Sequence, residues 1–206
     1  MGNLLAKFCV CPLLAAMVCG ASAAQERARS ENFELDADSI TLNTQTNLFE
    51  ARHPRIVQGN VRVEADESVA TGVDFAQRSE WRFKGHVKIH VDRAVLEADS
   101  AVFIFDSKKL SRADLEGTPA SFTDLPSPQQ KPVRGGARKL AYDHGARTLL
   151  LSEDAWVNKD QYELQSCDLI YDFNVEKVTS GPTDCGVRVR LPEKPKAQTP
   201  PAAPPQ

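Results

Sequence analysis

Short runs that alternate apolar and polar residues recur along most of this chain, and they constrain its fold more than any other feature. Examples are NVRVEA, EWRFKG, HVKIHV, AVLEA, RKLAY and GVRVRL. Alternation with a period of two places apolar side chains on one face of a β-strand. Polar or glycine-bearing turns separate the runs every 8 to 12 residues or so, roughly the spacing of an all-β sandwich or barrel. We therefore expect an all-β protein.

A weak internal repeat underlies these runs. One type of unit opens with a small residue and ends with an apolar or aromatic one: ADSITL from residue 37, ATGVDF from 70, ADSAVF from 98, ARKLAY from 137 and SCDLIY from 166. A second type comprises FKGHVKI from 83 and LSEDAWV from 151, with VQGNVRV from 57 in the same register. Such repeats indicate stacked units that share one core, so repeated strand pairs are the expected body of the domain.

Alternation carried through the repeat predicts a shared interior. The inward positions are Val73, Phe75, Phe83, Val87, Ile89, Ala101, Phe103, Leu140, Tyr142, Leu151, Ala155, Val157, Leu169 and Tyr171. The opposite, outward face carries Arg82, Lys84, His86, Lys88 and His90. The run AVFIF at 101–105 is apolar on both faces. Val102 and Ile104 therefore need an outer cover, either a crossing loop such as 125–136, the C-terminal tail or a partner protein.

Glycine and proline mark the expected loops. They cluster in LEGTP, LPSPQQKPVRGG and SGPTDCG. The longest of these interruptions runs from Leu125 to Gly136, and we expect Gly135–Gly136 to form a turn. Residues 192–206 are a proline-rich tail that is expected to be disordered.

The N-terminus is typical of a secretory signal peptide. Lys7 precedes an apolar core, and Ala21 and Ala23 fit a cleavage site before Ala24, with cleavage before Gln25 as an alternative. A lipoprotein acylated at Cys19 is a further alternative. We predict that residues 1–23 are a signal peptide and that the mature chain is exported.

Two cysteines, Cys167 and Cys185, remain after removal of the signal. In an oxidising compartment they can pair and close a loop of about 18 residues, which stabilises a fold by about 3 kcal/mol. The alternative is a buried thiol on a strand and a second thiol on a loop.

No cofactor, metal site or enzymatic activity is expected. The sequence contains no nucleophile elbow, phosphate loop, paired-cysteine zinc pattern or HExxH motif. His86 and His90 share one strand face but lie too far apart for one ion. The carboxylates of ELDAD and SEDAW fall at turns and strand ends, and nothing singles out a glycosidase-type pair. A net charge of −3 argues against nucleic acid as a partner.

The chain resembles the OstA-like, or LptA-like, family of periplasmic lipopolysaccharide transport proteins. The resemblance rests on FELDADSITL, GNVRV, LEADSAVF, LEGTPASF, RGGARKLAYD, LLLSEDAWV and DLIYD, and covers residues 31 to 181. The sequence departs from the family at Glu153, where glycine is usual, and at Cys167, where an acidic residue is common. The resemblance implies an open, twisted antiparallel β jelly roll over residues 31–191, located in the periplasm.

The resemblance also implies an interior that binds the lipid part of lipopolysaccharide. Phe33 and Leu35 match the family's opening strand and are expected at one end, while Phe122 and Tyr142 are expected inside. Together with the alternation, the expected lipid-binding residues are Phe33, Leu35, Phe75, Phe83, Phe103, Phe105, Phe122, Leu140, Tyr142 and Tyr171. The alternative for each of them is a plain core residue, and Phe33, near the mature N-terminus, fits that alternative least.

Family members bridge inner-membrane and outer-membrane machinery by stacking end to end. The implied partners are lipopolysaccharide, through its lipid A part, transport components of the same fold in both membranes, and further copies of this chain. We expect pairing at the edge strands, near Phe33–Leu42 and near Gln165–Asp172 or Gly186–Leu191. Two alternatives are an assembly module that holds no lipid and an exported enzyme that acts on cell-envelope glycans.

Overall fold

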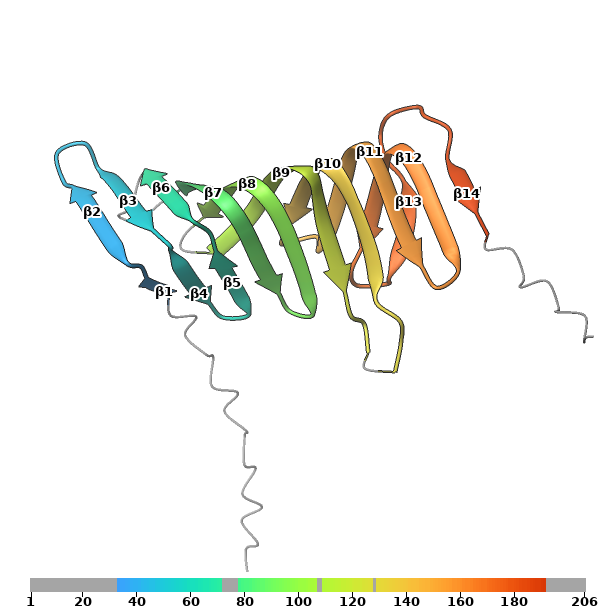
Figure 1. The fold of residues 1–206 in the computed structure, drawn as a ribbon, viewed down its shortest axis with the longest axis horizontal. Helices are drawn as coiled ribbons and strands as arrows, with labels where there is room; N and C mark the ends of the chain where they lie inside the picture. The colour runs from blue at the N-terminus through green and yellow to red at the C-terminus, as the bar shows by residue number, and fades with distance from the viewer. Residues whose placement is uncertain (1–32, 72–77, 107–108, 128, 192–206) are drawn as a thin grey trace, which may run out of the picture.

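The computed structural model describes residues 33–71, 78–106, 109–127 and 129–191. The expected signal peptide, Val73, Phe75 and the proline-rich tail lie outside the described residues. The described chain forms one antiparallel sheet of 14 strands, which confirms the expected all-β class (Figure 1). This part of the chain contains no helix that could cross a membrane. In chain order the strands are β1 (Phe33–Asp36), β2 (Ser39–Asn43), β3 (Leu48–Arg52), β4 (Arg55–Gln58), β5 (Val61–Glu64), β6 (Glu67–Thr71), β7 (Arg78–Val91), β8 (Ala94–Asp106), β9 (Lys109–Asp124), β10 (Val133–Asp143), β11 (Thr148–Lys159), β12 (Tyr162–Asp172), β13 (Lys177–Ser180) and β14 (Arg188–Arg190).

The long strands β7 to β12 bend near their middle, so that the sheet folds over itself into two layers. Layer A contains β2, β3, β6 and β13, together with the halves of β7 to β12 that lie in the same hydrogen-bonded ladder as these four strands. Layer B contains β1, β4, β5 and β14, together with the other halves. The layers meet in one core, where the rings of Phe33 in layer B and Trp81 in layer A lie 5.7 Å apart. We call the bent edge the corner, and the opposite edge, where turns of the two layers meet, the seam. The series of strands runs from β1 and β2 at one end of the molecule to β13 and β14 at the other (Figure 1).

The corner explains the internal repeat. The units that begin at residues 98, 137 and 166 cover the register shifts of β8, β10 and β12, and FKGHVKI and LSEDAWV cover those of β7 and β11. At the bends of β7 and β11, two successive residues adopt positive φ angles: 77° and 44° at Gly85 and His86, and 66° and 65° at Glu153 and Asp154. Both strands carry one more residue than their partner at the bend. An extra residue of this kind is a β-bulge, which bends the strand and increases its twist.

Glu153 has the backbone conformation that Gly85 adopts at the equivalent position of β7. A left-handed conformation costs a non-glycine residue roughly 1–2 kcal/mol. The carboxylate of Glu153 forms an exposed ion pair with Lys139, with 2.6 Å between Oε1 and Nζ. The departure from the family pattern at Glu153 therefore leaves the bend in place.

Two segments expected to be loops are strand segments instead. LEGTP lies inside β9, at its bend, and contains a cis peptide bond between Thr118 and Pro119. Gly135 and Gly136 belong to β10, so the expected turn is wrong and the connection between β9 and β10 covers only residues 125–132. The reason is steric: a Cβ atom on Gly135 would lie 2.4 Å from the Phe122 ring, so glycine here admits a neighbouring side chain.

The predicted inward face is confirmed for the described residues. The side chains of Phe83, Val87, Ile89, Ala101, Phe103, Leu140, Tyr142, Leu151, Ala155, Val157, Leu169 and Tyr171 are at most 3% exposed. Val102 and Ile104 point outward and are half-buried. Their cross-strand neighbours include Arg82 of β7 and Arg112 of β9. Long charged side chains cover apolar surface with their stems, whereas the loop expected to cover this pair lies at the opposite end of β8.

Of the two ranges predicted for the C-terminal edge of the sheet, 186–191 contains an edge strand and 165–172 is wrong. β1 and β2 are edge strands, as expected for residues 33–42. At the C-terminal end, however, β12 pairs with β11 on one side and with β13 and β14 on the other. Ile170, for example, lies between Leu150 and Thr179. Residues 165–172 are therefore internal, and β13 and β14 form the edges.

Candidate functional site

The interior between the two layers is the candidate functional site, and aromatic rings lie along its length. Toward β1 the rings are Phe33, Phe49, Trp81, Phe83, Phe103 and Phe105, with centroids 4.8–6.4 Å apart in contacting pairs. Toward β13 they are Phe122, Tyr142, Tyr171 and Phe173, at 4.8–6.2 Å. Offset and edge-to-face contacts of this kind add to the stabilisation that burial provides.

The structure brings together the predicted site residues that it describes. Phe83, Phe103, Phe105, Phe122, Leu140, Tyr142 and Tyr171 are buried in one core. Phe33 and Leu35 are half-buried and pack against that core at the β1 end. Phe75 lies outside the described residues.

The interior is closed. Side chains of the two layers interdigitate because contact between them removes apolar surface from water. A cavity of about 10 Å³ lies between Tyr142, Phe173 and the β7–β8 turn, at the lower limit for a single water molecule. A lipid chain can therefore contact the fully buried side chains of the interior only when the layers separate.

A buried carboxylate ties the layers together at the seam. Asp124, the last residue of β9 in layer B, is completely buried. It accepts hydrogen bonds from Arg93 Nε at 2.8 Å and from the Tyr171 hydroxyl in layer A at 2.7 Å. Burial, together with the hydrogen bond to Asp124, raises the pKa of Tyr171. The hydrogen bond to Asp124 also raises the pKa of Arg93.

Further polar contacts join the same turns. Arg93 Nη2 donates to the Phe173 carbonyl oxygen at 2.9 Å and lies 3.4 Å from the Glu176 carboxylate. Asp92 and Arg147 form an ion pair of 2.5 Å between the β7–β8 and β10–β11 turns. We refer to Asp92, Arg93, Asp124, Arg147 and Tyr171 as the seam latch.

Sequence reasoning missed the seam latch, although one signal pointed to it. Alternation along β9 places Asp124 on the same face as Ala120 and Phe122, both of which are buried. A carboxylate on an inward face needs a partner. Its partners, Arg93 and Tyr171, lie 31 and 47 residues away in the chain.

The two ends of the interior expose apolar side chains. Ile40 and Leu42 of the edge strand β2 are 51% and 54% exposed, although their cross-strand partners are buried. At the other end, Val189 of β14 is 55% exposed beside the half-buried Leu164. The apolar interior therefore ends, at both edges of the sheet, in side chains that are exposed to solvent.

Histidine pairs with carboxylate at the corner. His86 Nδ1 lies 2.8 Å from Asp66 Oδ2, and this contact raises the pKa of His86. Among the described residues, no group of three or more His, Cys, Asp or Glu side chains is placed to hold a metal ion.

Cys167 and Cys185 form a disulfide, with 5.8 Å between their Cα atoms. The bond holds the β13–β14 connection against β12. We expect replacement of both cysteines by serine to lower the free energy of unfolding by about 2–5 kcal/mol, because the unfolded chain loses a constraint. Urea denaturation of both proteins measures this difference. Alkylation of both thiols in unfolded, unreduced protein would contradict the bond.

Comparisons with known proteins agree with this architecture. A family model described as "LptA/(LptD N-terminal domain) LPS transport protein" matches residues 63–177. The crystal structure of LptH, the LptA-homologous periplasmic component of the lipopolysaccharide transport device of Pseudomonas aeruginosa, is similar at 13% sequence identity and a TM-score of 0.53. The match covers 80% of this chain and 98% of that one, and it shows a shared open β jelly roll. No curated protein matches the sequence.

Proposed function

This chain belongs to the family of LptA and LptD N-terminal domain proteins, which act in lipopolysaccharide transport, and from that premise we propose that its interior carries the acyl chains of lipopolysaccharide. Each methylene group removed from water contributes about 0.8 kcal/mol, so a long acyl chain gains on the order of 10 kcal/mol. A long apolar surface without directional contacts provides this energy. The observation that carries the proposal is the continuous apolar interior, which is exposed at both ends through Ile40, Leu42 and Val189.

Lipid entry in this proposal follows the seam. The strands β7 to β12 are continuous around the corner, whereas side-chain contacts of the seam latch join the layers at the opposite edge. Rupture of these contacts lets the layers move apart and exposes the aromatic rings to an acyl chain. The lipid then replaces contacts that the two layers make with each other.

Transfer of lipid between proteins takes place at the two ends of the molecule. Edge strands carry unpaired backbone groups that accept a strand from a partner. We propose that β1 and β2 of one molecule dock against β13 and β14 of a second copy, or against a related jelly roll of the inner-membrane or outer-membrane machinery. Such a contact joins two different surfaces and propagates in one direction.

The proposed location is the periplasm, with residues 1–23 removed as a signal peptide on export, 31–191 as the jelly-roll domain and 192–206 as a tail. The disulfide between Cys167 and Cys185 supports an oxidising compartment. The family is one of transport proteins, and we assign this member no catalytic role.

One observation favours a second function. The interior is densely packed, as in a module whose only task is to pair with related jelly rolls. In that case the core residues stabilise the domain and the edges alone are functional. Bound lipid distinguishes the two proposals.

Site-specific photocrosslinking tests lipid binding. With a photoreactive phenylalanine analogue at Phe33, Phe103 or Tyr142, we expect irradiation to attach lipopolysaccharide to the protein. The same analogue at Lys84 or Lys88, which point outward, should give at most about a tenth of that yield. Circular dichroism would establish that each variant folds. Equal attachment at inward and outward positions, or none at all, would support the assembly module instead.

A further inference from the structure

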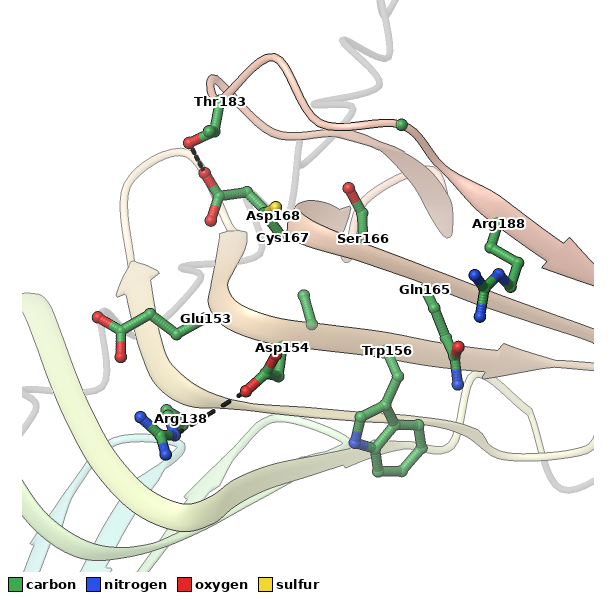
Figure 2. Close-up of a pocket in the computed structure, with 12 residues that line it drawn as sticks. Arg138, Glu153, Asp154, Trp156, Gln165, Ser166, Cys167, Asp168, Thr183 and Arg188 are labelled. Atoms are coloured by element: carbon green, nitrogen blue, oxygen red, sulfur yellow. Dashed lines mark hydrogen bonds and ion pairs between the residues drawn. The ribbon is translucent and has the colours of Figure 1, made fainter.

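An open groove of about 910 Å³ lies on the outer side of the sheet, beneath the connection between β13 and β14 (Figure 2). Its lining includes Arg138, Glu153, Asp154, Trp156, Gln165 and Arg188. These side chains come from the corner and from the outer face of layer B. The groove is therefore separate from the interior between the layers.

Trp156 is the unusual residue of this outer face. Its neighbours in β11, Ala155 and Val157, are buried in the core, so alternation directs the indole outward. The ring lies on the backbone of Gly136 in β10, where an added Cβ would approach Trp156 Nε1 to 3.0 Å. A glycine thus makes room for the ring, which is half-buried and lines the groove.

Polar groups surround the indole ring. Trp156 pairs across the strands with Gln165, and Gln165 pairs with Arg188 of β14. Arg138 and Asp154 lie 3.9 Å apart, and their side chains are 64% and 90% exposed. Figure 2 shows Arg138 and Asp154 pointing toward one another at the side of the groove. So loose and exposed a pair is worth little and can exchange its contact for one with a ligand.

The wall of the groove is held in place. Cys185 anchors the β13–β14 connection to Cys167, and Thr183 donates a hydrogen bond to the Asp168 carboxylate. The Gly181 amide also donates to the Asp168 carbonyl oxygen, at 3.0 Å. A wall fixed before binding reduces the entropy that a ligand site must lose.

We propose that this groove binds a saccharide, with a pyranose ring stacked on Trp156. An aromatic face offers an apolar platform for the C–H face of a sugar, while carboxylate, amide and guanidinium groups bond to hydroxyls. The charges decide between ligand classes. The groove presents no single sign of charge, because Arg138 and Arg188 lie beside Asp154 and the Lys139-paired Glu153, whereas sugar hydroxyls use donors and acceptors alike.

Two sources supply this chemistry in an exported protein: the sugars of a glycolipid and the glycan of the cell wall. The site is independent of the interior, so it stands whether or not acyl chains bind between the layers. A test therefore uses two soluble probes, the delipidated oligosaccharide of lipopolysaccharide and muramidase-released cell-wall fragments.

Titration of the exported chain by nuclear magnetic resonance reads the site directly. The protein has two tryptophans, and we expect a probe to shift the indole N–H signal of Trp156 but not that of the buried Trp81. Measured from backbone amide signals, which every variant retains, Trp156→Ala should weaken binding about tenfold or more, and Arg138→Ala with Arg188→Ala, which keeps the ring, about fivefold. Lys88→Ala, an outward cation of the same layer, is the matched control and should change affinity less than about twofold.

The outcomes separate as follows. Binding of the lipopolysaccharide oligosaccharide alone, or of the cell-wall fragments alone, supports the site and identifies its source. Binding of neither probe at millimolar concentration overturns it, as does binding that survives both sets of substitutions in folded protein. Failure of Trp156→Ala to fold leaves the double arginine variant to decide.

Discussion

Replacement of Asp124 by alanine is expected to lower the free energy of unfolding by about 3 kcal/mol, near the lower end for a broken buried ion pair. The substitution leaves the buried Tyr171 hydroxyl without its acceptor, which costs about 1–3 kcal/mol. It also removes the carboxylate from Arg93, which is 32% exposed and so recovers part of its hydration. Partial exposure of Arg93 is the reason for the lower value.

Urea denaturation of the oxidised protein measures this effect. Asp114→Ala is the matched control, because Asp114 also pairs with an arginine, at 2.7 Å, but both side chains are exposed. We expect that control to change stability by less than about 1 kcal/mol. A similar loss for the two variants would show that the seam contact contributes no more than a surface ion pair.

The second large effect concerns lipid capture. If acyl chains enter through the seam, a covalent link across it should reduce lipopolysaccharide capture by about tenfold or more, because the layers no longer separate. Asp92→Cys with Arg147→Cys, joined by a short thiol-reactive linker, places that link where an ion pair now joins the turns. Lipopolysaccharide that co-purifies with the protein is the quantity measured.

A matched link within one layer controls for the chemistry. Lys88 and Glu97 are cross-strand neighbours in layer B, with 3.0 Å between Nζ and Oε1. Their cysteine variants, joined by the same reagent, should capture lipid as the unlinked protein does. Undiminished capture by the protein linked across the seam would exclude this route of entry and favour entry from the ends.

Alternation and repetition in the sequence predicted the fold class and the orientation of most strands. Phe103 and Leu140 face the core because every second residue of a strand does, and that rule needs no tertiary information. The repeat also aligned Glu153 with Gly85, and the structure shows that both strands bend at this position. Local sequence patterns were sufficient wherever the strand alone determines which way a side chain points.

Contacts between distant segments were not predictable in this way. Arg93 bonds to the carbonyl of Phe173, 80 residues further along the chain. The glycine pair at Gly135 and Gly136 is typical of a turn, and only the Trp156 ring and the Ala120 carbonyl beside Gly136 explain its place in a strand. Of the two ranges expected for the C-terminal edge, 186–191 contains the edge strand β14, whereas 165–172 is internal, because β13 has four residues, too few for alternation to reveal.

The continuity of the long strands around the corner has a mechanical consequence. Every ladder hydrogen bond of the sheet runs along one layer or the other, and the bends of β7 to β12 lie within strands rather than between them. The two layers are thus joined by backbone at the corner and held together elsewhere by side chains. Separating the layers breaks no ladder hydrogen bond, so the free energy of opening is set by the side-chain contacts at the seam and in the interior. A lipid that replaces the interior contacts offsets part of that free energy.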